Sequence, residues 1–183
     1  MSLRFTLLGF LSYGPMTGYD LKKHIDNSTQ FFWHASLSQI YPTLKRMDED
    51  GLVEAAVIPQ EGRPDKKVYT ITPAGQAALM DWLAEPLGEL SPQKDPALLK
   101  LFFSGVLNRE AILAHLCRHQ ELHRARLAHY RKETASYIEQ IIVATDFTRE
   151  GIMWELVRQW GEQYEQAYIQ WLEQAIATIE EEF

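Results

Sequence analysis

The sequence predicts a mainly α-helical protein with one small β-hairpin, organised in two parts. Over residues 1–85, apolar residues recur mostly at helical spacing, and they alternate as in strands only around residues 53–71. Over residues 96–183 the helical spacing continues through two long stretches. The intervening residues 86–95 contain prolines and a glycine, which exclude a continuous helix. We therefore expect an N-terminal domain, a linker and a C-terminal helical domain with these boundaries.

The first two predicted helices are short. Residues 3–11 form an apolar run that is too short to span a membrane and fits a buried helix. Residues 14–18 predict a turn, and Thr17 is a suitable cap for a second helix that runs through Ile25. The aromatic cluster at residues 31–33 is most simply explained as core, packed beneath the helix that follows.

The third predicted helix is the most informative element. Ser36 followed by Gln39 is a capping-box pattern, and Gly51 suits the left-handed position beyond a helix end. Pro42 lies too deep for a first-turn proline, so it should bend the helix or weaken its bonding. An inward apolar stripe is predicted from Ile40, Leu44 and Met47. The outward side chains are then those of Ser38, Gln39, Tyr41, Thr43, Lys45 and Arg46.

A hairpin and a fourth helix complete the first part. Residues 53–57 alternate as in a half-buried strand, and residues 68–71 predict a returning strand after a turn-rich, partly basic segment. Thr72 and Pro73 then begin a helix that continues to about Glu85. Its inner side is predicted to carry Leu79, Trp82 and Leu83.

Three helices, a hairpin and a further helix in this order predict a winged helix-turn-helix, in which a late helix enters a DNA groove. The sequence also resembles the PadR-type transcriptional regulators over residues 1 to about 83. The matching motifs are Gly18-Tyr19-Asp20, Gln39-Ile40-Tyr41-Pro42-Thr43-Leu44, Asp50-Gly51-Leu52-Val53 and Tyr69-Thr70-Ile71-Thr72-Pro73-Ala74-Gly75. Asp65 departs from the family, which often has a basic residue at this wing position. The remaining chain is similar to the family's helical dimerisation region by pattern only.

The third helix and the hairpin tip carry the candidate contacts to double-stranded DNA. Hydroxyls, amides and cations are the groups that bind base edges and phosphates. We predict contacts from Ser36, Ser38, Gln39, Tyr41, Pro42, Thr43, Lys45 and Arg46, and from Arg63, Lys66 and Lys67 in the hairpin tip. The alternative is that these side chains are merely solvated.

The net charge of −7 is the main argument against nucleic acid as a partner. Residues 1–88 carry eight basic and ten acidic side chains, a charge of −2, whereas residues 89–183 carry ten and fifteen, a charge of −5. The acidic residues 48–50 should lie at the far end of the third helix, away from its contact surface. We therefore expect a local positive face, few phosphate contacts and a steep salt dependence.

The second part is predicted to contain helices over residues 96–107, 109–145 and 149–181. The first is so apolar that we expect it to be largely buried. The last carries a seam with coiled-coil spacing, formed by Val157, Trp160, Tyr164, Ala167, Trp171, Gln174 and Thr178. Two long amphipathic helices cannot bury both faces within one small chain. We predict a homodimer through these helices, with a monomeric antiparallel hairpin as the alternative. A symmetric dimer would place two recognition helices about 34 Å apart on a pseudo-palindromic operator.

The last predictions from the sequence concern an effector site and a metal site. The resemblance implies that some members bind flat aromatic or amphipathic effectors at the dimer interface, and Trp160 and Tyr164 are the candidate contacts here. Packing is the alternative role for these rings. His115, His119 and His123 lie four residues apart, but a straight helix cannot bring all three to one ion. We expect no metal or other cofactor, although two histidines completed by a partner chain would form a site.

Enzyme classes are excluded by the absence of their motifs: a glycine-rich phosphate loop, a nucleophile elbow and a zinc-protease signature. A single cysteine, Cys117, allows no intrachain disulfide. Without a long apolar run or a secretion signal, we expect a cytoplasmic protein with no membrane partner. The predicted function is a dimeric, sequence-specific transcriptional regulator, more specifically a repressor that blocks polymerase. The alternative is a winged-helix adaptor that binds protein and not DNA.

Overall fold

A computed structural model of the protein describes residues 2–29, 31–59, 62, 65–89 and 94–183. The chain forms two compact units, Met1–Leu90 and Ser91–Phe183. Within the described ranges, no helix combines the length and the apolar character that crossing a membrane requires.

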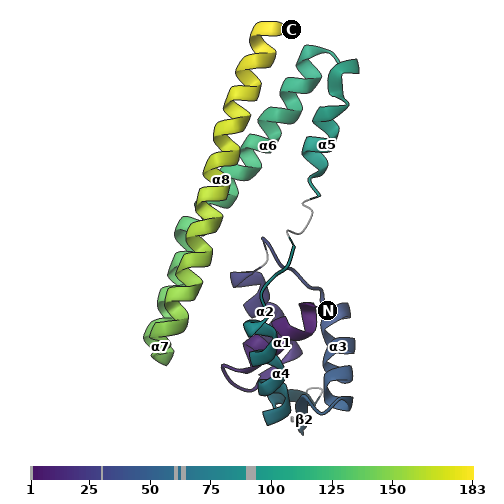
Figure 1. Ribbon diagram of the computed structural model, residues 1–183, viewed down its shortest axis with the longest axis vertical. Helices are drawn as coiled ribbons and strands as arrows, with labels where there is room; N and C mark the ends of the chain where they lie inside the picture. The colour runs from purple at the N-terminus through teal and green to yellow at the C-terminus, as the bar shows by residue number, and fades with distance from the viewer. Residues whose placement is uncertain (1, 30, 60–61, 63–64, 90–93) are drawn as a thin grey trace. The chain divides into compact units, whose positions relative to one another are not determined.

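The first unit is a winged helix. Figure 1 places α1 between α2, α3 and α4, and it contacts all three helices. The three strands pair antiparallel in the order β1-β3-β2, with Val53 opposite Ile71 in the predicted hairpin. The prediction of a simple turn over residues 14–18 was wrong, because Met16 pairs with Tyr69 and adds a third strand. The elements are α1 (Ser2–Leu11), β1 (Met16–Thr17), α2 (Gly18–Ser28), α3 (Leu37–Glu49), β2 (Val53–Ile58), β3 (Lys66–Ile71) and α4 (Pro73–Ala84).

The core of this unit confirms the predicted inner stripe of α3, because Ile40, Leu44 and Met47 are at most 1% exposed. They pack against Leu7, Leu8, Leu11, Leu21 and Ile25 of α1 and α2. At the end of α3, Gly51 adopts the predicted left-handed conformation with φ of 71°. The N–H of Leu52 then donates to the carbonyl of Met47 at 2.9 Å, which closes the helix and starts β2.

The aromatic cluster at residues 31–33 was predicted to be core, but Phe32 is 48% exposed and Trp33 is 36% exposed. The backbone N–H groups of both residues donate to the carbonyl of Thr29, at 3.0 and 2.7 Å. This tight turn at the end of α2 carries the two rings outward, and the small side chain of Ala35 enters the core instead.

The inner side of α4 is narrower than predicted. Leu79 is buried at 6% exposure, but Leu83 is 63% exposed and Trp82 is 40% exposed. The Trp82 ring stacks on Phe5 of α1 with the ring centroids 4.8 Å apart. Only the face of α4 that carries Leu79 is therefore buried, and Leu83 in the following turn lies at the surface.

The second unit is entirely helical in its regular elements. Its elements are α5 (Pro96–Phe102), the 3₁₀ turn η1 (Ser104–Val106), α6 (Arg109–His129), the π-helical turn η2 (Tyr130–Thr134), α7 (Ala135–Thr145) and α8 (Thr148–Glu182). Figure 1 shows α8 running alongside α6 and α7, and α8 contacts both. The predicted break follows Thr145, where Asp146 has a left-handed φ of 58°.

The predicted helix over residues 96–107 is shorter, and the prediction that it is largely buried was wrong for the single chain. It ends at Phe102, and Phe102, Phe103 and Val106 are 81%, 66% and 90% exposed. The reason is that, of the apolar residues in 96–107, Leu101 alone packs against the small core formed by Ile112, Leu116 and Leu172.

The predicted helix over residues 109–145 contains a π-helical turn that was not predicted. Tyr130 in this turn is buried, and its ring lies where a Cβ on Gly161 of α8 would come within 2.5 Å. Arg158 also donates to the carbonyl of Tyr130 at 3.3 Å. The extra residue of a π-turn therefore directs a large ring against a position of α8 that lacks a side chain.

The helix α8 carries two parallel seams. The seam that packs within the chain includes Gly151, Gly161, Glu165 and Leu172, all buried. The seam predicted from the sequence runs beside it, and Val157 and Trp160 there are 45% and 56% exposed. A single chain thus covers one seam and leaves much of the predicted one at its surface.

Candidate nucleic-acid interface

The outer side of α3 gathers the predicted contact residues on one surface. Because the opposite stripe is buried, the exposed side carries Ser36, Ser38, Gln39, Tyr41, Pro42, Lys45 and Arg46, with Thr43 half-buried among them. Pro42 lies inside the helix, which nevertheless continues from Leu37 to Glu49. The hydroxyl of Thr43 donates to the carbonyl of Gln39 at 2.8 Å, so part of its bonding capacity is used within the helix.

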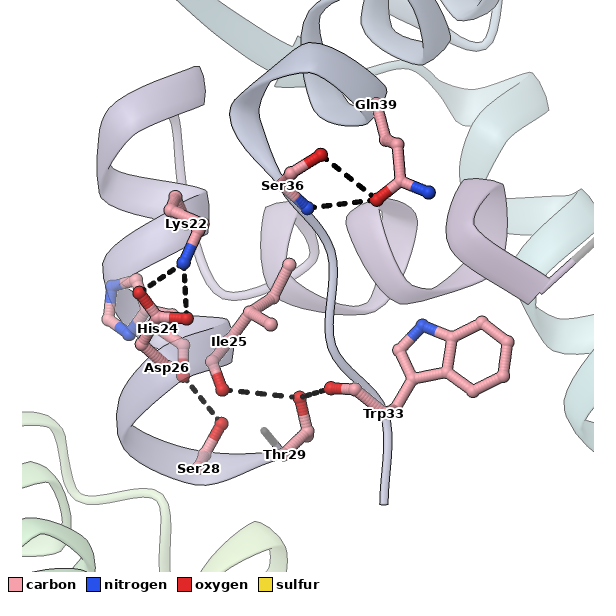
Figure 2. Close-up of polar contacts among 9 residues, drawn as sticks. All are labelled: Lys22, His24, Ile25, Asp26, Ser28, Thr29, Trp33, Ser36 and Gln39. Atoms are coloured by element: carbon pink, nitrogen blue, oxygen red, sulfur yellow. Dashed lines mark hydrogen bonds and ion pairs between the residues drawn. The ribbon is translucent and has the colours of Figure 1, made fainter. Parts of the chain in front are cut away.

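The first turn of α3 is a small polar network (Figure 2). The side-chain oxygen of Gln39 accepts hydrogen bonds from the backbone N–H and the hydroxyl of Ser36, at 3.0 and 3.1 Å. The hydroxyls of Ser36 and Ser38 lie 2.8 Å apart. Ser36 is the N-cap of α3 and Gln39 is its capping-box partner, as the sequence predicts. The amide oxygen of Gln39 is already bonded, so bidentate binding to adenine requires its release from Ser36.

Two tyrosines lie at the first turn of α2. A Cβ on Gly18, the first residue of α2, would lie 2.6 Å from Cε1 of Tyr41, so the Tyr41 ring packs directly on that helix start. Tyr41 is 46% exposed and Tyr19, next to Gly18, is 66% exposed. Tyr19 was not among the predicted contacts. Its signal in the sequence is its place between Thr17 and Asp20, whose capping bonds hold the helix start and leave the intervening side chain outside.

The capping box of α2 is complete. The hydroxyl of Thr17 accepts from the N–H of Asp20 at 3.1 Å, and the Asp20 carboxylate accepts from the backbone N–H of Thr17 at 3.0 Å. The Thr17 side chain also donates to Asp20, and this bond is the main cause that lowers the pKa of the Asp20 carboxyl. Further along α2, Lys22 bonds to the carboxylate of Asp26 (Figure 2).

Acidic residues at the end of α3 partly neutralise the predicted positive face. Lys45 lies 3.8 Å from Glu49, and Lys67 of β3 lies 3.7 Å from Asp48. The acids therefore reach two predicted DNA contacts, contrary to the expectation that they lie apart from them. Arg46 and Lys66 have no ion pair with any described residue. Exposed pairs of this kind contribute only about 0.2–1 kcal/mol, so phosphate can replace the carboxylate.

The hairpin tip is described in part. Lys66 and Lys67 begin β3 as exposed residues opposite Ile58 and Val57, so they stand at the tip end of the hairpin. Arg63, the third predicted contact there, lies outside the described residues.

Two family models match the chain. Residues 7–81 match the transcriptional regulator PadR-like family, and residues 93–180 match the virulence activator alpha C-terminal family. The negative transcriptional regulator PadR of Bacillus subtilis is 29% identical over 98% of both chains. Its structure in complex with operator DNA superposes with a TM-score of 0.84 over 98% of this chain and 99% of that chain.

The chain belongs to the PadR-like family of transcriptional regulators. The Vibrio cholerae virulence activator AphA is similar in structure, with 30% identity, a TM-score of 0.72 and coverage of 97% of this chain and 98% of that one. The probable transcriptional regulator Rv1176c of Mycobacterium tuberculosis is 42% identical over 98 residues, which span 54% of this chain and about half, 52%, of that protein. B. subtilis PadR has also been solved in complex with p-coumaric acid, with a TM-score of 0.78 and 29% identity over 99% of this chain and 100% of that one.

In this PadR-family chain the two predicted effector contacts are neighbours. The rings of Trp160 and Tyr164 stack on α8 with centroids 5.6 Å apart. Trp160 is 56% exposed, and Tyr164 is half-buried and lies 5.9 Å from the ring of Tyr168. The pair therefore forms a partly open aromatic surface on the seam predicted for dimerisation.

The histidines considered as metal ligands lie on α6 and have different surroundings. His123 is buried, and its Nδ1 lies 2.5 Å from the carboxylate of Glu165 while its ring stacks on Tyr168 at 3.9 Å. The ring of His119 lies 6.0 Å from that of His123. Throughout the described ranges, no group of three or more histidine, cysteine or acidic side chains is placed to hold a metal ion.

Proposed function

We propose that this PadR-family regulator is a homodimer that binds a pseudo-palindromic operator and represses transcription by excluding polymerase. In this proposal residues 1–85 bind DNA, residues 86–95 link, and residues 96–183 dimerise. The observation that carries it is the construction of α3, with one face fully buried and the opposite face made of hydroxyls, an amide, a tyrosine and cations.

Dimerisation is supported by the apolar surface that one chain leaves open. The predicted seam of α8 holds Val157 and Trp160 at 45% and 56% exposure, and α5 exposes Leu99 and Phe102 at 62% and 81%. A second copy of the chain would bury both surfaces, since in a two-fold symmetric dimer the same apolar surface of each subunit forms the interface. Negative regulation is supported by the B. subtilis relative, a negative transcriptional regulator whose structure is known in complex with operator DNA.

Release by a small aromatic or amphipathic effector is a further part of the proposal. It is supported by the p-coumaric acid complex of B. subtilis PadR. The stacked rings of Trp160 and Tyr164 are the contacts proposed from the sequence. An effector acts by binding one arrangement of the two winged helices more tightly than the other.

The test begins with selection of bound sequences from a random duplex pool, followed by fluorescence anisotropy on the selected site. Lys45→Ala and Arg46→Ala should each weaken binding about three- to fivefold, because each removes a cation worth about 1 kcal/mol at the surface. Arg118→Ala is the matched control, since Arg118 is also an exposed cation and forms a surface pair with Glu121. Unchanged affinity in both test variants, with intact dimers in ultracentrifugation, would remove α3 from the contact surface.

The excess of acidic groups favours one second candidate, a winged-helix adaptor that binds protein and not DNA. The chain carries a net charge of −7, and two of the predicted contact lysines are paired with carboxylates. Binding to random duplex at two salt concentrations separates the candidates. A DNA-binding regulator binds at low salt and loses affinity steeply as salt rises, whereas an adaptor binds at neither concentration.

A further inference from the structure

The hydrogen bonds around Gln39 fix which atom of its side-chain amide faces outward. The amide oxygen accepts from the backbone N–H of Ser36 at 3.0 Å and from the Ser36 hydroxyl at 3.1 Å. Because a backbone N–H can only donate, the oxygen of the amide, and not its nitrogen, must face Ser36. The two bonds occupy both lone pairs of this oxygen. Figure 2 shows the amide nitrogen on the side turned away from Ser36.

The amide nitrogen of Gln39 is left as a donor. It has no hydrogen bond to any residue that the structure describes, and the side chain is exposed on the outer side of α3. An amide nitrogen carries two protons and has no capacity to accept. In this capped arrangement Gln39 therefore presents only donors to a molecule that approaches this face of the helix.

The neighbouring hydroxyls support the same orientation. Ser36 has a single hydroxyl proton, which it donates to Gln39. The hydroxyl oxygens of Ser36 and Ser38 lie 2.8 Å apart, so the proton between them comes from Ser38. The bonds thus run in one direction, from Ser38 to Ser36 to Gln39. Turning the Gln39 amide over would place its nitrogen against the Ser36 backbone N–H, donor against donor, so the orientation is maintained by the backbone itself.

Base edges in the major groove differ in what they offer to such a donor. Guanine presents two adjacent acceptors, N7 and O6, whereas adenine presents the acceptor N7 beside its N6 amino group, a donor. A glutamine that is free to turn binds adenine through both its oxygen and its nitrogen. A glutamine that can only donate leaves the adenine amino group unpaired, and an unpaired buried donor is costly. Thymine offers a single acceptor, O4, beside a methyl group. Guanine is therefore the base that suits the capped Gln39.

We propose that Gln39, held by Ser36, determines specificity for guanine, which it reads through N7 and O6 in each half-site of the operator. The inference rests on the proposed function, since α3 must enter the major groove. It reverses the preference for adenine that an unrestrained glutamine would have. Ser36 acts here as a positioning residue, because it selects the base through the orientation of the Gln39 amide.

The experiment selects bound sequences from a random duplex pool with the full chain, both unchanged and as Gln39→Ala. The base pair at which Gln39→Ala loses its preference is the pair that Gln39 reads. In the unchanged protein we expect guanine there, favoured over adenine by about tenfold in the dissociation constant measured by fluorescence anisotropy. Gln76→Ala is the matched control, because Gln76 is an exposed glutamine near the start of α4. It should keep the preference at every pair.

Base analogues at this position identify the atoms that are read. Inosine has the same N7 and O6 as guanine, so a duplex with inosine should bind equally well. The analogue 7-deazaguanine lacks N7 but still pairs with cytosine, and it should weaken binding by about threefold or more.

Two variants test the role of the cap. Gln39→Glu keeps an oxygen for the Ser36 N–H but has no donor, so it should lose the guanine preference while circular dichroism shows unchanged helical content. This variant decides the question even if Gln39→Ala unfolds. Ser36→Ala removes one of the two bonds that orient the amide and should lower the guanine-to-adenine ratio about threefold or more at this pair alone. A purely structural role of Ser36 would weaken binding to all sequences equally.

Several results would overturn the inference. They are a base other than guanine at the pair read by Gln39, a guanine preference that survives in Gln39→Glu, full affinity for 7-deazaguanine, and an unchanged base ratio in Ser36→Ala. Loss of preference at no pair in Gln39→Ala would also contradict it. These outcomes leave an operator-binding regulator intact. Failure of the unchanged protein to select any sequence would instead contradict the proposed function, and the inference with it.

Discussion

Gly18→Ala tests whether the position of the Tyr41 ring matters for DNA binding, independently of its chemistry. The new Cβ would lie 2.6, 3.0 and 3.2 Å from three ring carbons of Tyr41. Since ordinary carbon–carbon contacts lie at about 3.5–4.0 Å, the ring must move by about 1 Å. That displacement exceeds the tolerance of about 0.5 Å expected for a preorganised contact surface.

The magnitudes for stability and for binding differ. Tyr41 is 46% exposed, so its ring can swing outward, and alanine is a better helix former than glycine by up to about 1 kcal/mol. The free energy of unfolding should therefore change by no more than about 1 kcal/mol. Truncating an aromatic anchor at an interface costs about 2 kcal/mol or more, and a displaced ring keeps part of its contacts. We expect a loss of about 1–2 kcal/mol in binding, or about five- to thirtyfold in the dissociation constant.

The assay is fluorescence anisotropy on the selected operator, together with thermal unfolding, for Gly18→Ala, Tyr41→Ala and Gly9→Ala. Gly9 is the matched control, because it lies within α1 and a Cβ there meets nothing within 4 Å. Operator affinity should fall in the first two variants and stay unchanged in the third. If Gly18→Ala binds normally while Tyr41→Ala does not, the contact at Gly18 does not set the working position of the ring.

Three further predictions concern charge. Asp48→Asn and Glu49→Gln should each strengthen operator binding by up to about fivefold at low salt, since each frees a lysine from a surface pair worth at most about 1 kcal/mol. Weaker operator binding of either variant in fluorescence anisotropy would contradict this prediction. Glu165→Ala should lower the free energy of unfolding by about 3–5 kcal/mol, because it leaves His123 and Arg126 without their buried carboxylate. Glu173→Ala, in an exposed pair, should change it by less than about 1 kcal/mol in the same urea titration. The pKa of Asp20 is depressed below 3.8 in the folded protein, so its stabilisation is present above that pH and is lost as pH falls through the folded pKa. The stability of the protein and of Asp20→Asn should therefore converge in acid, and a constant difference down to pH about 2 would refute the assignment.

Short-range signals determined the elements and the composition of α3. A cap, a stripe and a terminal glycine act within a few residues, so Thr72 begins α4, Gly51 ends α3, and Ile40 and Leu44 face inward as the spacing predicts. The order of these elements was sufficient to predict a winged helix, because few other arrangements bury those stripes.

Contacts between distant residues were decided only by the tertiary structure. The pairing of Lys67 with Asp48 joins β3 to α3, and the pairing of His123 with Glu165 joins α6 to α8. Trp33 turns outward, whereas the small side chain of Ala35 enters the core beneath α3. The packing of Leu101 of α5 against Ile112 and Leu116 of α6 and Leu172 of α8 likewise joins distant parts of the chain. Apolar periodicity indicates that a face is buried, but the partner that covers it is chosen by the whole fold. Within one chain α8 packs through Gly161, Glu165 and Leu172, beside the seam that the sequence predicts for the dimer.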